Sequence, residues 1–143
     1  MTTAHVYGLA QAGLASKTID LVNDSIKVML CTSVYAPNQD THQFKSDVTN
    51  EVTGTGYTAG GQALTGKALS YSATGHTETW TAANPSFPAS TITARFAVFY
   101  QDTGTSTTSR LIAYWDFGVD VASSGGAFTL TVAAGGLVAL AAA

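Results

Sequence analysis

Two runs of alternating side chains, separated by a short polar loop, constrain the fold of this chain most strongly. Residues 92–101 read ITARFAVFYQ, and residues 110–117 read RLIAYWDF. Both runs alternate with the two-residue period of a β-strand and are rich in aromatic and β-branched side chains. The loop between them, DTGTSTTS, contains the aspartate, glycine and small hydroxyl residues typical of hairpin turns. We therefore predict an antiparallel hairpin here.

The first strand of this hairpin has aromatic side chains on both faces. Phe96, Val98 and Tyr100 alternate with Arg95, Ala97 and Phe99. Packing in a core or between sheets is the default for such aromatics. For one of the two rows, contact with a neighbouring subunit is the alternative. A sugar-binding platform would instead need two or three aromatics together on one exposed face.

The rest of the chain also favours short strands. They are expected at about 25–32, 63–72 and 77–83, and in AFTLTVA and GLVALA near the C-terminus, whereas NPSFPAS is expected to be a crossing segment. Residues 4–15 have apolar side chains at helical spacing. Short strands without βαβ alternation indicate an all-β protein, mainly an antiparallel β-sandwich, jelly-roll-like fold or barrel, with a short N-terminal helix. We expect one domain over residues 1–143, with residues 1–17 as an N-terminal helical arm.

Charged residues are sparse and scattered. They make up 10% of the chain, against about 25% in an average soluble domain. The six Lys and Arg residues form no run that could follow phosphates, so we expect no nucleic-acid partner. We expect no membrane partner, because the apolar C-terminal stretch is well short of the roughly 20 residues that span a bilayer. We also expect no signal peptide and synthesis in a reducing cytoplasm. So little ionic surface favours contact with other subunits.

A glycine-rich segment resembles a phosphate-binding loop only in part. Residues 61–67 read GQALTGK, which matches GxxxxGK, but Ala68 stands where the magnesium-binding Ser or Thr should be. A strand-like KALSYS follows, where a P-loop requires a helix. We therefore interpret the glycines as bends in a loop and expect no nucleotide cofactor.

Residues 35–47, YAPNQDTHQFKSD, are the densest cluster of chemically capable side chains. His42 stands between Asp40 and Asp47, but the chain has no HxH, HxxxH, CxxC or EF-loop spacing for a metal. Asp40 is expected to form an Asx turn and Thr41 to cap a helical turn within residues 41–50.

Other candidate reactive groups give no catalytic pattern. Cys31 lies in the apolar run IKVMLCT and is expected to be a small buried side chain. Nothing pairs a nucleophile with a base, so we expect no catalytic residue, metal or cofactor.

Four stretches carry a resemblance to a known group of proteins. They are IDLVNDSIKVMLCTSVYAPNQDTHQFKSDV, EVTGTGYTAGGQALTGK, FAVFYQDTGTSTTSRLIAYWDFG and GGAFTLTVAAGGLVAL. With the N-terminal helix they extend over about residues 4–140. The chain resembles small structural proteins encoded among the virion genes of tailed bacteriophages, including head decoration (cement) proteins. The resemblance implies a β-sandwich-like virion protein present in many copies, and it transfers no catalytic residue.

We therefore expect a virion structural protein that is not an enzyme, most simply a decoration protein that stabilises the head by binding over capsid subunits. Its partners would be other virion proteins, the major capsid protein first, and copies of itself, with a trimer favoured. A neck, tail or fibre component and a glycan-binding host-recognition module are the alternatives. Subunit contacts are expected at Tyr35, His42, Phe44, Tyr57 and Phe99, and more broadly in the 41–62 loop region and at the termini.

Overall fold

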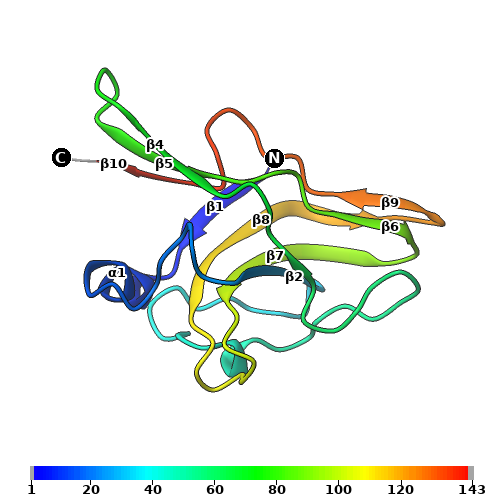
Figure 1. Cartoon of the computed structure of the whole chain (residues 1–143). Coiled ribbons are helices and arrows are strands. Elements are labelled where there is room, and N and C mark those ends of the chain that lie inside the picture. Colours follow the sequence, from blue (N-terminus) through cyan, green and yellow to red (C-terminus); the bar gives the residue numbers. More distant parts are fainter. Residues whose placement is uncertain (1, 142–143) are drawn as a thin grey trace.

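The structure is a computed structural model, and it describes residues 2–141. Within them lie ten β-strands, one α-helix and one short 3₁₀-helix (Figure 1). In chain order they are β1 (Thr3–Val6), α1 (Gly8–Ala15), β2 (Ile26–Cys31), η1 (Lys45–Asp47), β3 (Gln62–Ala63), β4 (Ala68–Ser72), β5 (Thr77–Thr81), β6 (Ser86–Ser90), β7 (Thr93–Gln101), β8 (Leu111–Ala122), β9 (Gly126–Thr129) and β10 (Val138–Ala141). The predicted class, mainly antiparallel β with one short N-terminal helix, is confirmed.

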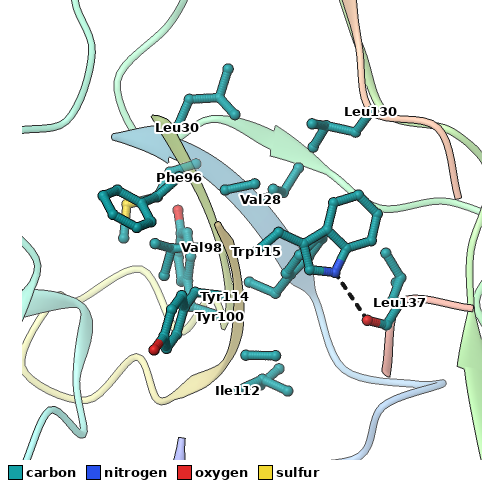
Figure 2. Close-up of a cluster of buried hydrophobic side chains, with 14 of the residues drawn as sticks. Val28, Leu30, Phe96, Val98, Tyr100, Ile112, Tyr114, Trp115, Leu130 and Leu137 are labelled. Atoms are coloured by element: carbon teal, nitrogen blue, oxygen red, sulfur yellow. Dashed lines mark hydrogen bonds between the residues drawn. The ribbon is translucent and has the colours of Figure 1, made fainter. Parts of the chain in front are cut away.

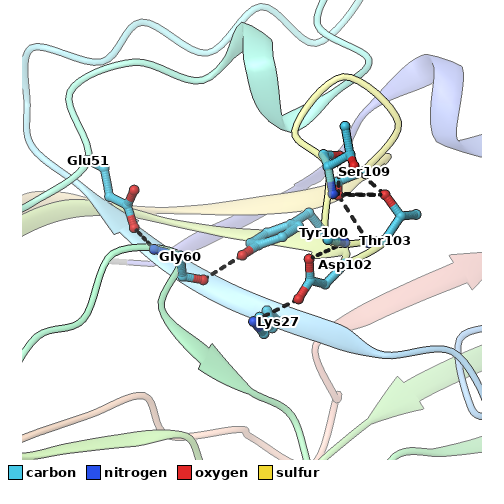
Figure 3. A network of polar contacts seen from close by, with 9 residues as sticks. Lys27, Glu51, Gly60, Tyr100, Asp102, Thr103 and Ser109 are labelled. Carbon is cyan, nitrogen blue, oxygen red and sulfur yellow. Dashed lines mark hydrogen bonds and ion pairs between the residues drawn. The ribbon is translucent and has the colours of Figure 1, made fainter.

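A five-stranded sheet in the order β1-β8-β7-β2-β3 forms the middle of the molecule. The predicted hairpin is present as β7 and β8, which pair antiparallel. Its loop is held by small polar side chains, since Thr103 Oγ1 lies 3.1 Å from Ser109 Oγ. An ion pair of 2.7 Å between Lys27 and Asp102 ties the base of the loop to β2 (Figure 3). The alternating strand sequences and the polar residues of the loop together determine where this hairpin forms.

One face of the sheet is covered by the 32–61 loop and the region around α1. Tyr35, from the loop, packs edge-on against Phe96 of β7, with ring centroids 5.8 Å apart. Lys45 lies over the ring of Tyr100, 5.1 Å from its centroid. The long loop therefore packs against the sheet as a layer.

The other face is covered by two smaller sheets, with strand orders β10-β5-β4 and β6-β9. Phe99 of β7 has no exposed surface and packs against Trp80 of β5 and Trp115 of β8. The indole N–H of Trp115 donates to the Leu137 carbonyl at 3.0 Å (Figure 2). Both rows of the aromatic strand are thus buried by the chain itself, and the alternative in which one row contacts a neighbouring subunit is wrong. No closed barrel forms among residues 2–141.

The N-terminal segment differs from its prediction. Residues 3–6 form β1, which pairs with β8 in a register that runs from Thr3 opposite Asp116 to Val6 opposite Ala113. The helix spans only Gly8–Ala15. Helical spacing over residues 4–15 was therefore misleading at its start, because pairing with the edge of β8 satisfies these backbone groups and overrides local propensity. The helical arm of residues 1–17 is corrected to a strand followed by a helix within residues 3–15.

The proline-containing segment at residues 84–90 also differs, because part of it is a strand. β6 pairs antiparallel with β9, with a register irregularity between Phe87 and Ser90. Pro88 lies inside that irregularity, where a missing backbone N–H removes no regular ladder bond. The proline marks a bulge in the strand and not its absence.

Candidate functional site

The 35–47 corner is organised around a hydrogen-bonded chain of rings. Tyr7 and Tyr35 hydroxyls lie 2.9 Å apart, and the Tyr35 hydroxyl lies 3.0 Å from His42 Nδ1. The Asn38 backbone N–H also points at Nδ1, at 3.4 Å. Because that N–H can only donate, Nδ1 acts as the acceptor, so that Tyr35 donates to His42 and Tyr7 donates to Tyr35. The three rings join the N-terminal segment to the corner.

Burial keeps the two tyrosine hydroxyls of this hydrogen-bonded group protonated. It raises the pKa of Tyr7 well above its usual range and that of Tyr35 to about 12. The pKa of the buried Cys31 thiol is also raised, to about 12, first by burial and then by Glu51. A protonated, inaccessible thiol is not a nucleophile near neutral pH, and Cys31 is fully buried, as predicted. The corner is arranged for packing.

The turn chemistry of the corner is assigned to different residues than predicted. Asn38, and not Asp40, forms the Asx turn, with its Oδ1 accepting the N–H groups of Asp40 and Thr41. Thr41 caps no helix, since η1 begins at Lys45. Asp47 reaches back instead, and its carboxylate accepts the backbone N–H groups of residues 43 and 44 at 2.8 and 2.9 Å.

Removing the hydrogen-bonded rings should destabilise the fold and release no metal. We expect Tyr35→Phe to lower the free energy of unfolding by about 2 kcal/mol, because it leaves the buried Tyr7 hydroxyl without its partner. We expect His42→Ala to cost about 1–2 kcal/mol through the lost bond and ring stack. Urea unfolding measures both losses, and elemental analysis of the purified proteins measures metal. A stoichiometric metal present in the wild type and missing from His42→Ala would contradict this interpretation.

Asp47 should make stability depend on acid pH. Its pKa is lowered from 3.8, first by the N–H of Phe44 and then by that of Gln43. A lowered carboxyl pKa stabilises the folded state above pH 3.8, and the contribution disappears as the pH falls through the lowered value. We expect Asp47→Asn to lose about 1 kcal/mol at pH 6, at the low end for such bonds because the carboxylate is partly exposed. Unfolding curves should converge with the wild type in strong acid.

The matched control for Asp47 is Asp40→Asn, seven residues earlier on the same corner. The Asp40 carboxylate is exposed, and no hydrogen bond to it is found among residues 2–141. Asp40→Asn should leave the unfolding curve unchanged both at pH 6 and in strong acid. An equal loss in the two variants would show that general charge, and not the turn, is responsible.

The five expected contact residues are divided by burial. Tyr35 and Phe99 have at most 2% of their surface exposed, so they are corrected from contact residues to core residues. His42, Phe44 and Tyr57 are half-buried. The Phe44 ring lies beneath the Arg110 guanidinium at 5.4 Å, which leaves little of it for a neighbour.

Tyr57 closes the outer edge of the main sheet. Its hydroxyl accepts the N–H of Leu30 at 3.0 Å and donates to Glu51 at 2.7 Å. The N–H of Val52 donates to the Leu30 carbonyl at 2.9 Å, just beyond the two residues of β3. The backbone N–H and C=O groups on the outer edge of β2 are therefore paired within the chain, and this edge is unavailable to another strand.

The glycine-rich segment is a fixed loop and not a phosphate site. Glu51 accepts the N–H of Gly60 at 2.6 Å, and the Tyr100 hydroxyl donates to the Gly60 carbonyl at 2.6 Å (Figure 3). Lys67 donates to the Asp24 carbonyl, and the strand β4 follows in place of a helix. The interpretation of these glycines as bends in a loop agrees with this geometry.

Neither a cluster of metal-ligating side chains nor a membrane-spanning helix is found in the part of the chain that is described. No group of three or more His, Cys, Asp or Glu side chains there could hold a metal ion. None of the helices within residues 2–141 has the length and apolar character needed to cross a bilayer.

Two strand segments collect most of the exposed apolar surface, which sequence reasoning missed. Six large apolar side chains are exposed among residues 2–141: Leu9, Val34, Leu69, Tyr71, Val119 and Val121. Four of the six lie on β4 and on the last part of β8. β4 is the outermost strand of its sheet. The last part of β8 is uncovered by β1, whose pairing ends at Asp116, and its residues 117–120 form a bulge between the pairs Phe96–Asp116 and Ala94–Val121 with β7. A free edge with apolar side chains is a typical docking surface for another strand.

A groove of about 600 Å³ adjoins the free edge of β8. The aromatic side chains of Trp115, Phe117 and Phe128 line it together with Val121 and Leu130, and serine, threonine, alanine and glycine residues complete its walls. Its lining contains no charged residue. A groove of this size and character suits an apolar segment better than an ionic ligand.

The exposed aromatic side chains give little support to the glycan-binding alternative. Tyr71 is the one aromatic among the exposed large apolar side chains of residues 2–141. The platform that the sequence left open needs two or three on one face. The buried strand aromatics, including the three that line the groove, have at most 9% of their surface exposed.

No family model, curated protein or solved structure matches this chain.

Proposed function

We propose that this chain is a structural protein of a tailed-bacteriophage virion that decorates the head in many copies and stabilises it by binding over capsid subunits. The proposal rests on one structural observation, the gathering of exposed apolar side chains on two uncovered strand edges of a low-charge chain. The sequence resemblance supports the same class of protein. Interaction through neutral strand edges is what a protein needs when its task is to assemble.

The remainder of the surface suits a rigid building block. Tyr57 fixes the 32–61 loop to Leu30 of β2, and Asp102 fixes the hairpin loop to Lys27 of β2. Within the two loops, Glu51 bonds to Gly60 and Thr103 to Ser109. Pre-ordered loops lose little conformational entropy when a neighbour binds them.

Small contacts are sufficient for such a role. Burying about 100 Å² of apolar surface contributes about 2.5 kcal/mol, at about 25 cal/mol per Å². When many such contacts are linked across a shell, each copy is held more tightly than by one contact alone, and the shell becomes stiffer.

The test is to count copies in particles of the virus that encodes the chain. Quantitative mass spectrometry should find hundreds of copies in each particle, and they should sediment with heads separated from tails. A dozen copies or fewer would indicate a neck, tail or fibre component instead. Absence from the particle would overturn the virion proposal.

A second measurement addresses decoration itself. Particles that lack the protein should release DNA at a lower temperature and in milder salt than complete particles. Re-addition of purified protein should restore the loss. Unchanged heat and salt stability would reject the stabilising role, even if the protein is present in the particle.

A further inference from the structure

We propose that His42 is an acid-sensitive latch: a proton on its Nδ1 opposes the hydrogen bonds that hold the 35–47 corner to the N-terminal segment, so that acid loosens this segment from the corner. The proposal rests on the direction of the hydrogen bonds among three rings. It goes beyond the virion role and does not depend on it, because its test uses the purified chain alone.

The hydrogen bonds among the three rings run in one direction. His42 Nδ1 faces two groups, the Tyr35 hydroxyl at 3.0 Å and the Asn38 backbone N–H at 3.4 Å. The N–H can only donate, so Nδ1 is an acceptor and carries no proton in this arrangement. The Tyr35 proton is then directed at His42, and the Tyr35 oxygen accepts from the Tyr7 hydroxyl at 2.9 Å. Tyr7 is therefore the first donor and Nδ1 the final acceptor.

A proton on Nδ1 would reverse this order. The protonated nitrogen can only donate, so the Tyr35 oxygen has to accept from it and the Tyr35 proton has to turn towards Tyr7. The Tyr7 hydroxyl then loses its acceptor in a side chain with no exposed surface, since Tyr35 is its one hydrogen-bond partner within residues 2–141. The Asn38 N–H would also face a second donor. An unpaired buried hydroxyl and two opposed donors both disfavour the closed corner.

His42 is the member of the group that acid can reach. Its side chain is half-buried, whereas Tyr7 and Tyr35 have at most 2% of their surface exposed. Burial raises the pKa of Tyr7 well above its usual range and that of Tyr35 to about 12, so neither hydroxyl changes charge near neutral pH. An imidazole is the kind of side chain whose charge changes at mildly acid pH. A proton that enters this group therefore enters at the ring of His42.

The charged side chains of the corner do not replace the lost hydrogen bonds. The Asp47 carboxylate attracts a charged His42 ring, but its Oδ2 already accepts two backbone N–H groups, and no hydrogen bond joins the two side chains within residues 2–141. Asp40 is exposed, where solvent screens its charge. Lys45 and Arg110 are held over the rings of other residues. The donors that face Nδ1 at close range therefore decide the direction of the effect.

Three contacts join the corner to the point where β1 leads into α1. One is the bond between the Tyr7 and Tyr35 hydroxyls. In the second, the Gly8 N–H donates to the Gln39 carbonyl at 2.9 Å, and in the third the Gln39 side chain donates to the Val6 carbonyl at 2.7 Å. Val6 ends β1 and Gly8 begins α1. A weakened corner therefore releases this junction first and leaves the central hairpin in place.

Replacing His42 with asparagine should remove the acid sensitivity. The amide oxygen of Asn accepts hydrogen bonds near the position of Nδ1 but takes up no proton. A base that the folded state keeps unprotonated lowers stability as the pH falls. Between about pH 8 and about pH 5, the unfolding equilibrium constant of the wild type should therefore rise about tenfold relative to that of His42→Asn. Urea unfolding at the two pH values measures this ratio.

The matched control is His76→Asn, the same substitution at an exposed histidine. His76 has a φ of +49°, which asparagine adopts readily, so the variant should fold. Its pH dependence should equal that of the wild type. Equal pH dependence in the wild type and His42→Asn would overturn the proposal. A wild type that gains stability relative to His42→Asn in acid would also overturn it, because attraction by Asp47 would then outweigh the opposed donors.

Hydrogen exchange in the wild type tests the location of the effect, and it decides the matter even if His42→Asn does not fold. The Gly8 N–H should lose about tenfold in protection, corrected for the intrinsic rate, as the His42 ring becomes charged, which its Cε1 proton reports by NMR. The N–H of Val98, in the middle of β7, should keep its protection. Unchanged protection at Gly8 after the ring is charged would overturn the proposal. An equal loss at Val98 would overturn it too, since acid would then loosen the whole fold.

Discussion

Replacing Trp80 with alanine should lower the free energy of unfolding by about 4 kcal/mol, one of the two largest losses we expect from a single substitution in this chain. Trp80 is 1% exposed, and it is the residue through which β5 packs on the main sheet. Its ring meets Phe99 edge to face at a centroid distance of 6.3 Å. Truncation would leave a cavity between two layers that are joined by few other large side chains of β5.

Trp80→Phe separates the packing of the indole from its hydrogen bond. The indole N–H donates to the Leu21 carbonyl at 3.0 Å in a buried site. Phenylalanine keeps most of the aromatic contact but leaves that carbonyl unpaired, so the loss should be about 2 kcal/mol. Denaturant unfolding followed by far-UV circular dichroism measures both variants. A loss below about 1 kcal/mol for Trp80→Ala would mean that the small sheet is not anchored through this residue.

Local patterns predicted those elements whose sequence and environment agree. The alternation in β7 and β8, and the polar residues between them, indicated the central hairpin and the antiparallel class. The apolar run of β2 likewise indicated a buried strand and the burial of Cys31. In each case the periodicity of the side chains and their burial in the folded protein both indicate a strand.

The remaining differences depend on long-range pairing. Residues 4–6 have helical spacing, but they are a strand because β8 offers an unpaired edge more than 100 residues later in the chain. Asn38 and Asp40 are both good turn formers, and only the path of the chain decides which side chain reaches the two N–H groups. Local propensity does not distinguish these alternatives.

The candidate surface was hidden for the same reason. Nothing in the sequence shows that β1 ends opposite Asp116, and that register is what leaves the end of β8 uncovered. Leu69 and Tyr71 alternate as in any half-buried strand, so their exposure becomes evident only once the hairpin is seen to extend beyond the sheet. Conversely, Phe99 and Tyr35 lose their role as contact residues because layers from the same chain cover them.

Replacing Gly61 with alanine should cost about 3–4 kcal/mol and should reduce soluble expression. Gly61 has a φ of +75°, and an added Cβ would lie 1.8 Å from the Val28 carbonyl oxygen and 2.7 Å from the Met29 Cα. These are backbone atoms of β2, at the centre of the core, so they cannot move aside as a flexible side chain would. The loss combines backbone strain at positive φ with overpacking, each of about 1–3 kcal/mol.

Gly104→Ala is the control that separates these two contributions. Gly104 has a φ of +83° in the hairpin loop, with nothing within 4 Å of an added Cβ, so it should show the strain alone, at about 1 kcal/mol. The excess loss in Gly61→Ala over Gly104→Ala then measures the clash with β2. Equal losses in the two variants would mean that the end of the 32–61 loop moves away from β2 at little cost. In that case the bonds from Glu51 and Tyr100 to Gly60 would not fix the loop as the structure indicates.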